Sequence, residues 1–160
     1  MPETATAATV ELKPGDTAPD FTAETTDGSR IALHDFKGKS SVVLYFYPED
    51  MTPGCTIEAQ RFRDDHRKYE DANTVVLGVS MDPREMHEEF TEKEHLNFPL
   101  LVDTNGEICR SYGVPVEDHW AKRWTFLIGK DGKILKAYHK VDARTHSGEL
   151  LHDIAATPGR

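Results

Sequence analysis

The sequence predicts an α/β domain whose mixed central sheet is covered by helices on both faces and is extended by an N-terminal β-hairpin. Two continuous runs of β-branched, aliphatic and aromatic residues, at 41–47 and 74–80, are typical of strands buried on both faces. A segment with helical features follows each run, and a hairpin pattern at 124–138 comes later. Buried strands that alternate with helices indicate a sheet that is packed on both sides.

A tail and a short hairpin begin the chain. Residues 1–12 are mostly small and polar and show no periodicity, so we expect a flexible tail before a single domain at 13–157. The segments 21–24 and 29–33 flank a turn that ends at Gly28. This arrangement predicts an antiparallel hairpin.

The first buried strand, 41–47, ends at Pro48, and a helix is predicted over 53–70. The residues expected on its buried face recur at spacings of 3, 4 and 3, which is the period of a helix. They are Ala59, Phe62, His66 and Tyr69.

A helix-start signal follows the second buried strand, 74–80. Asp82 is placed as the capping residue, Pro83 as the first helical residue and Glu85 as the third. A short strand at 98–102 comes after this helix.

Three short elements complete the domain. A helix is expected at 106–112, with Asn105 as its cap and Gly113 as its stop. The pattern at 124–138 consists of two strand-like segments around a four-residue loop with a glycine at each end, and it predicts an antiparallel hairpin. A final helix is expected at 146–156.

The charge balance limits the partners of the protein. The chain has 19 basic and 28 acidic residues, a formal net charge of −9, which argues against a general nucleic-acid binder and against a polybasic membrane attachment. Its apolar runs are far shorter than the roughly 20 residues of a membrane helix, and its first residues do not resemble a secretory signal. We therefore expect a cytoplasmic protein with no nucleic-acid or membrane partner.

Cys55 is one of two cysteines, too few for a disulfide scaffold, and it lies where a buried strand gives way to a helix. Thr52 is placed as the N-cap and Pro53 as the first helical residue, so Cys55 falls in the first turn. The free amides and the dipole of that turn favour a thiolate, and we expect a lowered pKa. Gly54 allows another group to approach closely. The alternative is a buried, inert cysteine in a capped helix.

A central strand that leads into a cysteine-bearing helix favours a thioredoxin-like fold, and the residues around Cys55 extend this likeness. The pattern Pro48-x-x-x-Thr52-x-x-Cys55 resembles the active-site signature of the peroxiredoxins, and Thr56 and Glu58 continue it in the manner of the bacterioferritin comigratory protein (Q-type) subfamily. Further motifs resemble the family in the same order along about 140 residues. They are Gly15-Asp16-x-Ala18-Pro19-Asp20-Phe21, Asp35-Phe36-Lys37-Gly38-Lys39, Phe98-Pro99-Leu100-Leu101-x-Asp103, Tyr112-Gly113-Val114 and Arg123-x-Thr125-Phe126-Leu127-Ile128.

The resemblance implies a thiol peroxidase that reduces hydrogen peroxide and organic hydroperoxides. Cys55 would be the peroxidatic nucleophile and would become a sulfenic acid. Thr52 would hydrogen-bond the thiolate and the peroxide, Pro48 would shield the pocket, and Arg123 would lower the pKa of Cys55 and polarise the peroxide. The resemblance implies no metal, flavin, haem or other cofactor.

Arg123 and Glu58 each have a simpler interpretation as solvated residues. An arginine that starts a strand and a glutamate on a helix are both commonly exposed to water. The resemblance favours Arg123 as a catalytic residue, and it makes Glu58 a candidate to orient Arg123 through an ion pair.

The residue expected to regenerate Cys55 is absent from its usual place. Many Q-type members carry a resolving cysteine five residues after the peroxidatic one, where this sequence has Gln60. Cys109, the second thiol, is interpreted as a packed structural residue, and the alternative is a disulfide with Cys55 after local unwinding of its helix. We therefore expect a one-cysteine mechanism in which thioredoxin, glutaredoxin or a low-molecular-weight thiol resolves Cys55.

Other functions receive less support from the sequence. The eight histidines match no metal-binding motif, and we expect surface or packing roles for them and no metal site. A peroxide sensor that relays oxidation to a partner, and a non-enzymatic thioredoxin-like binding or holdase module, are the alternatives. We expect an antioxidant role in cell redox homeostasis, performed by a monomer or a weak homodimer.

Overall fold

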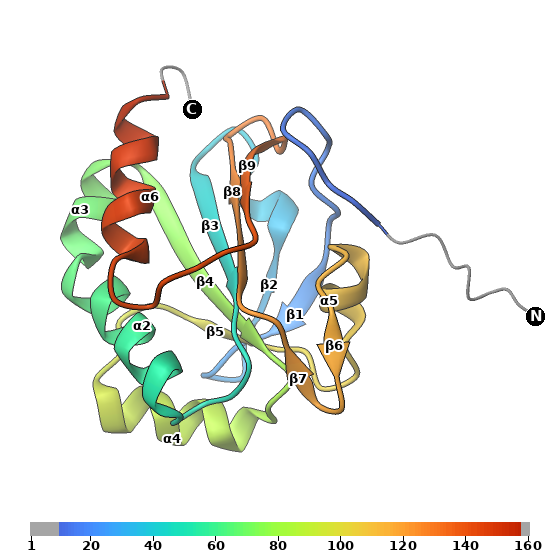
Figure 1. The fold of residues 1–160 in the computed structure, drawn as a ribbon, viewed down its shortest axis with the longest axis vertical. Helices are drawn as coiled ribbons and strands as arrows, with labels where there is room; N and C mark the ends of the chain where they lie inside the picture. The colour runs from blue at the N-terminus through green and yellow to red at the C-terminus, as the bar shows by residue number, and fades with distance from the viewer. Residues whose placement is uncertain (1–9, 158–160) are drawn as a thin grey trace, which may run out of the picture.

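A computed structural model describes residues 10–157, and a five-stranded sheet lies at the centre of this part of the chain (Figure 1). Its strands, in spatial order, are β5 (Leu100–Val102), β4 (Thr74–Ser80), β3 (Ser41–Phe46), β8 (Trp124–Ile128) and β9 (Ile134–Tyr138). β4 and β5 continue the sheet parallel to β3, whereas β8 is antiparallel to β3 and β9 to β8. The predicted mixed sheet is confirmed. Most of the predicted tail, residues 1–9, lies outside the described residues.

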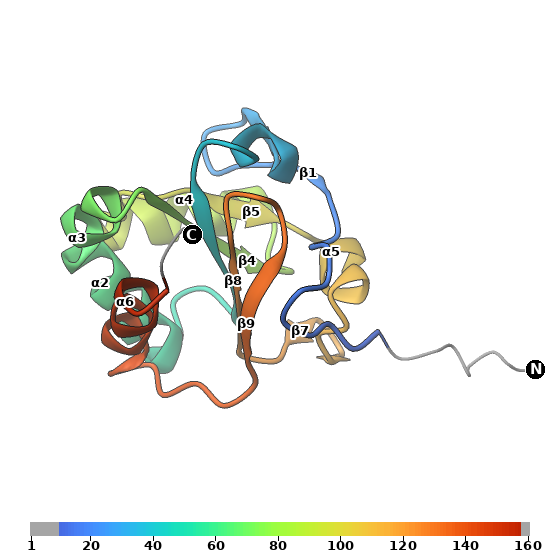
Figure 2. The same ribbon diagram turned by 90° about the horizontal axis from the view of Figure 1, so that it is seen from above.

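Helices lie on both sides of this sheet, as predicted, and Figure 2 shows the two layers from above. One side carries α2 (Pro53–Asp64), α3 (His66–Asp71), α4 (Arg84–Glu94) and α6 (His146–Ala155), and the other carries α5 (Glu107–Ser111). α4 lies across the lower end of the sheet, near the start of α2 (Figure 1). Among residues 10–157, no helix has the length and apolar character needed to span a membrane.

The alternating side chains of β3 divide the core into two halves. Val42, Leu44 and Phe46 pack on the side of α5, and Val43 and Tyr45 pack on the side of α2. Every residue of β3 is buried, which explains why its sequence shows no polar alternation.

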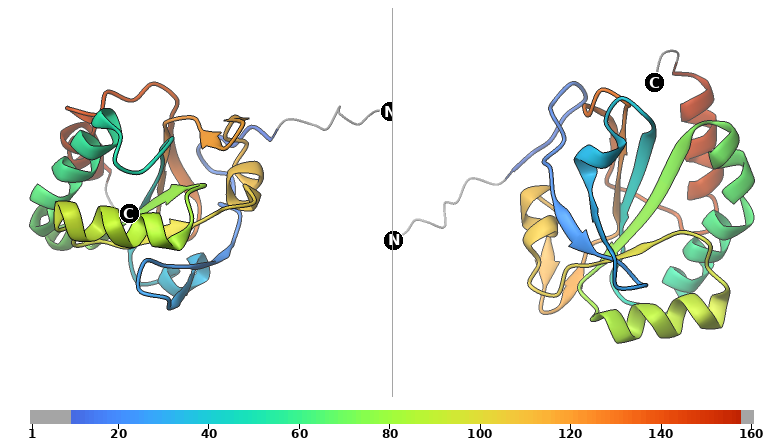
Figure 3. Two further views of the ribbon diagram at one scale, coloured as in Figure 1. Left: turned by 90° about the horizontal axis from the view of Figure 1, so that it is seen from below. Right: turned by 180° about the vertical axis from the view of Figure 1, so that it is seen from behind.

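The predicted N-terminal hairpin is confirmed as β1 (Thr22–Glu24) and β2 (Arg30–Ala32). It lies beside β5, as the view from behind in Figure 3 shows, and Thr25 forms an isolated bridge with Leu101. The chain then makes a 3-10 turn at Leu33–Phe36, whereas the sequence pattern extends the strand to residue 33.

A second small hairpin was not predicted. It consists of β6 (Val116–Glu117) and β7 (Trp120–Ala121), which pair antiparallel beside α5 (Figure 1). Two-residue strands are too short to produce a detectable alternation of polar and apolar residues.

The predicted helix over 53–70 is wrong in one respect, because it is broken at Asp65. α2 ends at Asp64 and α3 begins at His66, and the backbone of Asp65 departs from helical geometry with φ −94° and ψ 8°. The Asp65 side chain accepts a hydrogen bond from Ser147 Oγ at 2.7 Å. This tertiary contact with α6 holds the break, and the local sequence does not encode it.

One predicted helix cap is wrong, and another forms only part of the cap that the structure shows. α4 begins at Arg84 with Pro83 in the N-cap position, and the Asp82 carboxylate is directed elsewhere. α5 has Gly106 in its N-cap position. The predicted cap, Asn105, accepts from the backbone N–H of Glu107 at 3.2 Å, and Asp103 accepts from those of Ile108 and Cys109 at 2.9 and 3.0 Å. A carboxylate three residues before the N-cap position thus shares the capping of α5 with the predicted residue.

Candidate active site

Cys55 is the third residue of α2 and lies directly beyond the end of β3. Its side chain is almost fully buried, with 2% of the residue exposed. Thr52 occupies the N-cap position as predicted, but its side chain does not cap the helix. The Thr52 hydroxyl instead donates to the backbone carbonyl of Glu49 at 2.9 Å. The lone pairs of this oxygen are therefore available to accept a hydrogen bond.

Arg123 reaches Cys55 from a part of the chain 68 residues away. Its Nη2 lies 3.4 Å from Cys55 Sγ. The pairing of Phe46 with Trp124 between β3 and β8 places Arg123 beside the strand end that leads to Cys55. The contact also depends on Gly54, because a Cβ there would lie 3.0 Å from Arg123 Nη2. Gly54 was expected to admit a close neighbour, and the structure identifies that neighbour as the guanidinium.

Glu58 holds the other side of the same guanidinium. Its Oε1 accepts from Arg123 Nη1 at 2.6 Å, and only 1% of Glu58 is exposed. The alternative of a solvated helix face is therefore wrong, because Glu58 is part of the core. Arg123 uses two nitrogens of its planar fork to contact a carboxylate and a sulfur at once.

The electrostatics of the site combine burial with the charge of Arg123. Burial raises the pKa of the Cys55 thiol, and the charge of Arg123 acts in the opposite direction without cancelling it. The lowered pKa expected from the helix position is thus not found, because the sequence pattern took no account of burial. Burial also raises the pKa of Glu58 to about 7, although Arg123 opposes the shift.

Pro48 and Arg123 are among the residues that line an open groove of about 380 Å³. The rest of its wall comes from the unpredicted β6–β7 hairpin and the residues next to it, including Val116 and Trp120. These two side chains are unusually exposed for apolar residues, at 39% and 50%. The groove therefore provides an apolar surface beside the cysteine site.

Cys109 occupies a different environment from Cys55. It is fully buried in the half of the core that faces α5, whereas Cys55 is buried in the half that faces α2, so the sheet separates them. Burial raises the pKa of Cys109, and the nearby Asp103 raises it further. Gln60, at the position of the expected resolving cysteine, donates to the Glu94 carboxylate at 2.8 Å. The fold described here therefore keeps the two thiols apart.

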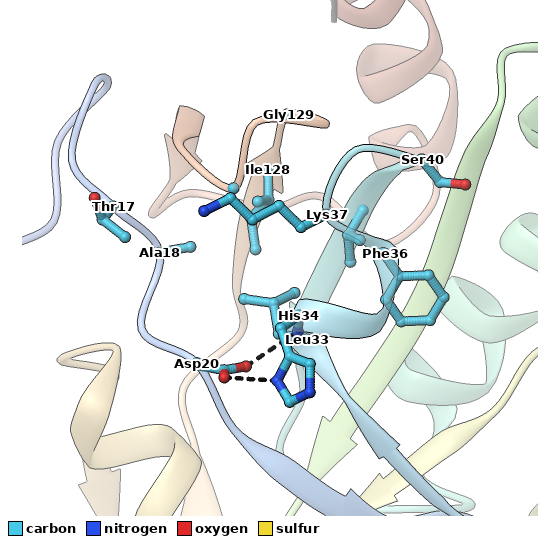
Figure 4. A pocket seen from close by; sticks show the side chains of 12 residues that line it. Thr17, Ala18, Asp20, Leu33, His34, Phe36, Lys37, Ser40, Ile128 and Gly129 are labelled. Carbon is cyan, nitrogen blue, oxygen red and sulfur yellow. Dashed lines mark hydrogen bonds and ion pairs between the residues drawn. The ribbon is translucent and has the colours of Figure 1, made fainter.

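A separate hollow lies at the opposite end of β3 (Figure 4). It has a volume of about 140 Å³ and is lined by residues such as Ser40 and Ile128. At its edge, Asp20 accepts from the backbone N–H of His34 at 3.1 Å and contacts the ring Nδ1 at 2.8 Å. This hollow adjoins the start of β3, and Cys55 follows the end of β3, so the two sites are separate.

Sequence reasoning missed a buried polar cluster beside the loop that precedes α2. Ligand atoms of Asp50, Asp82 and His87 lie within 4.8 Å of one another, although the three residues come from two loops and a helix. His87 was expected on the surface or in packing, and it is fully buried. The only local signal was its spacing of three residues from Phe90, which places both on the buried stripe of α4.

Comparison with known proteins gives a consistent result. The model of the AhpC/TSA family matches residues 14–137. Peroxiredoxin Bcp of Bacillus subtilis is 40% identical over 153 residues, which cover 91% of this chain and 96% of that protein. Peroxiredoxin Bcp of Escherichia coli is 39% identical over 148 residues, which cover 88% of this chain and 94% of the other.

Solved structures agree with the sequence comparisons. The crystal structure of peroxidoxin BcpB from Mycobacterium tuberculosis has a TM-score of 0.86 and 32% identity, and it covers 91% of this chain and 98% of its own. A mutant of Xylella fastidiosa PrxQ has a TM-score of 0.86 and 31% identity, with 92% and 98% covered. The predicted thioredoxin-like fold is confirmed by this similarity.

Proposed function

We propose a mechanism for this protein, which belongs to the AhpC/TSA family and is a thiol-dependent peroxidase: Cys55 attacks the hydroperoxide, and an external thiol then restores it. The observation that carries the assignment is the 3.4 Å contact between Arg123 Nη2 and Cys55 Sγ, with Glu58 fixing the guanidinium from its other side. A cysteine that faces a fixed cation at the start of a helix has the surroundings of a reactive thiol.

The reaction is a displacement at oxygen. The Cys55 thiolate attacks one peroxide oxygen, the O–O bond breaks, and the other oxygen leaves as hydroxide or alkoxide and takes up a proton. Cysteine is thereby oxidised to a sulfenic acid, and the peroxide is reduced to water or an alcohol. Arg123 stabilises the negative charge that moves from sulfur to the leaving oxygen. Thr52, whose own proton is donated to Glu49, accepts the O–H of the incoming hydroperoxide.

Organic hydroperoxides fit the groove that Pro48 and Arg123 help to line. The exposed apolar side chains of Val116 and Trp120 line it, and we assign them to the organic group of the substrate. Alkyl peroxide reduction activity is described for the bacterioferritin comigratory protein of Xanthomonas campestris, whose solved structure is 30% identical to this chain and has a TM-score of 0.83. Pro48 is one of the residues that line this groove, and we assign it the role of shielding the buried sulfur.

Regeneration of Cys55 is assigned to an external thiol. Cys109 lies across the sheet, and the position of the usual resolving cysteine holds Gln60. The reductant is thioredoxin, glutaredoxin or a low-molecular-weight thiol. Because Cys55 is 2% exposed, its sulfenic acid must become more accessible before such a thiol reacts with it.

We propose that the protein acts in the cytoplasm, which is a reducing compartment. Both cysteines are free thiols, which suits such a compartment. We assign the activity to a monomer or a weak homodimer, since Cys55 and its partners Thr52, Arg123 and Glu58 all belong to one chain.

The test is to add hydrogen peroxide below one equivalent to the reduced protein and to map both cysteines by peptide mass. We expect one added oxygen on Cys55, an unmodified Cys109, and recovery of the thiol after addition of thioredoxin or a small thiol. An unmodified Cys55 would refute the assignment of the nucleophile, and a disulfide with Cys109 would refute external resolution. Slow recovery with every reductant would instead indicate a peroxide sensor.

A further inference from the structure

The loop between β3 and α2 is tied to two other parts of the protein through Asp50. The Asp50 carboxylate accepts from Tyr47 Oη at 2.6 Å and contacts His87 Nδ1 of α4 at 2.6 Å. The Asp50 backbone N–H donates to Asp82 Oδ2 at 2.8 Å. Both the side chain and the main chain of this one loop residue are therefore held, and 3% of it is exposed.

The position of one proton follows from the contacts of His87. Its Nε2 lies 2.8 Å from the backbone carbonyl of Leu101, which only accepts, so Nε2 carries a hydrogen. Its Nδ1 shares a second proton with the Asp50 carboxylate at 2.6 Å. Burial lowers the pKa of His87, but Asp50 and the Leu101 carbonyl together raise it by more, so the net shift is upward. The contacts of both ring nitrogens therefore favour a proton on each of them.

A metal ion is a poorer occupant of this cluster than the proton. Both ring nitrogens of His87 already have partners, and Nδ1 lies only 2.6 Å from the Asp50 oxygen. This separation is that of a strong hydrogen bond, whereas two separate ligands of one ion are usually farther apart. Asp82 is likewise occupied, because Ser80 Oγ donates to it at 2.7 Å.

The tied residue is adjacent to the catalytic ones. Met51, the next residue, has a left-handed backbone with φ 65°, and Thr52 follows it as the N-cap of α2. Thr52 in turn bonds back to the carbonyl of Glu49. A movement of Asp50 would therefore displace the Thr52 hydroxyl and the first turn that carries Cys55.

We propose that His87 is a positioning residue for the peroxidase reaction, and that the buried chain Tyr47–Asp50–His87 is a latch that holds the β3–α2 loop closed. This inference rests on the proposed role of Cys55. When the latch is closed, Thr52 and Cys55 are fixed for reaction with a hydroperoxide. When it opens, the loop and the first turn of α2 loosen, and the oxidised sulfur becomes accessible to a thiol. Closure thus favours the oxidation step, and opening favours the reduction step.

Two substitutions of one residue separate the latch from general stability. His87→Gln places an amide nitrogen where Nε2 was, so it keeps the bond to Leu101 and loses the bond to Asp50. His87→Asn places an amide nitrogen where Nδ1 was, so it keeps the bond to Asp50 and loses the bond to Leu101. Both variants remove the imidazole ring, and they retain different partners; the asparagine side chain is also one methylene shorter.

The main readout is the accessibility of Cys55, measured by peptide mass as the ratio of its reaction rates with a bulky and a small thiol reagent. We expect His87→Gln to raise this ratio about fivefold and to slow oxidation by peroxide about tenfold, as expected for the loss of one charged hydrogen bond. His87→Asn should change each value by less than about twofold. Equal effects of the two variants would overturn the latch, because they would show a structural role only.

Two further measurements keep the test decisive if His87→Gln fails to fold. Asp50→Ala removes the same link from the loop side and should reproduce the raised accessibility ratio. In the wild-type protein, peroxide treatment should increase hydrogen exchange in residues 47–56 and in the first turn of α4 together, and exchange confined to α2 would contradict the latch. The accessibility ratio in the reduced protein does not depend on which residue the peroxide oxidises, so failure of the latch and failure of the Cys55 assignment are distinguishable.

Discussion

Cys55 and Cys109 are the two cysteines of one chain, both are buried, and each lies near the start of a helix. The difference between them lies in the charged group nearby. Cys55 faces the guanidinium of Arg123 at 3.4 Å, whereas the Asp103 carboxylate accepts the backbone N–H of Cys109 and adds to the rise in the pKa of its thiol. They also lie on opposite faces of the sheet. Burial disfavours the thiolate at both sites. Arg110 opposes this effect at Cys109 through its charge, whereas at Cys55 the cation also hydrogen-bonds the sulfur.

The comparison shows that a helix start alone does not make a cysteine reactive. In α5 two of the free amides of the first turn are used by Asp103, and one of them belongs to Cys109 itself. In α2 the Thr52 side chain leaves the amides uncapped, because it bonds to Glu49. An anion placed at the helix start removes the advantage that a thiolate would otherwise gain there.

Replacement of the nucleophile should give the largest effect. We expect Cys55→Ser to lower kcat/KM for hydrogen peroxide by at least about 1,000-fold, because a serine hydroxyl is a far weaker nucleophile than a thiolate. The measurement is peroxide consumption with excess thiol. If Cys55→Ser were as active as the wild-type protein, the nucleophile would have to be Cys109, and Cys55 would be the structural thiol.

Removal of the cation should come next. We expect Arg123→Met to lower the rate of Cys55 oxidation about 100-fold and to raise the pKa of Cys55 further. Thiolate absorbance as a function of pH and stopped-flow oxidation measure the two effects. Arg123→Lys should recover little, because one ammonium group cannot contact Glu58 and Cys55 as the two nitrogens of the fork do. Full activity in the lysine variant would contradict this geometry.

The partner of Arg123 offers a test by pH. The pKa of Glu58 is about 7 in the folded protein, compared with 4.5 as the ordinary value. Between these values the unfolded chain has released a proton that the folded protein still holds, so folding stability falls as the pH rises. We expect wild type to lose about 1–3 kcal/mol relative to Glu58→Gln between pH 4.5 and pH 7. Denaturant unfolding at both pH values measures this difference, and a constant difference would be the contrary result.

The smallest effect on activity is expected at the second cysteine. Cys109→Ser should retain kcat/KM within about twofold when an external thiol is supplied, and should lose about 1–3 kcal/mol of stability because a hydroxyl is buried in an apolar core. Steady-state kinetics and thermal unfolding measure the two values. A large loss of turnover with normal sulfenic acid formation would show that Cys109 takes part in resolution.

Much of the fold was predictable because its signals are local. The strand at 41–47 is continuous in hydrophobicity, and the structure has β3 at Ser41–Phe46. The strand at 74–80 matches β4 at every residue. The break at Asp65 was not predictable, because Ser147 of α6 holds it from 82 residues away. The same holds for Asp82, whose carboxylate accepts from Asp50 and Ser80 rather than from the start of α4.

The candidate site likewise has residues that the local sequence identifies and contacts that only the tertiary structure shows. Pro48, Thr52, Gly54 and Cys55 lie in one short segment, so their motif and their helix position could be identified from the sequence. The contact of Arg123 with Cys55 was expected only through the resemblance to a family. Its distance and the burial of Glu58 depend on the pairing of β3 with β8. The upward shift in the pKa of Cys55 depends on burial, which no local pattern reports.

Local sequence is sufficient for most of the order of strands and helices, for the position of Cys55 at a strand-to-helix junction and for the finding that Gln60 stands where a resolving cysteine is expected. These features depend on neighbours within a few residues, and periodicity and spacing record them. Tertiary structure is needed to show that Arg123 and Glu58 meet at Cys55, that the sheet separates Cys109 from it, and that His87 contacts the loop through Asp50. The reason is that sheet pairing and core packing set the distances between residues far apart in the chain.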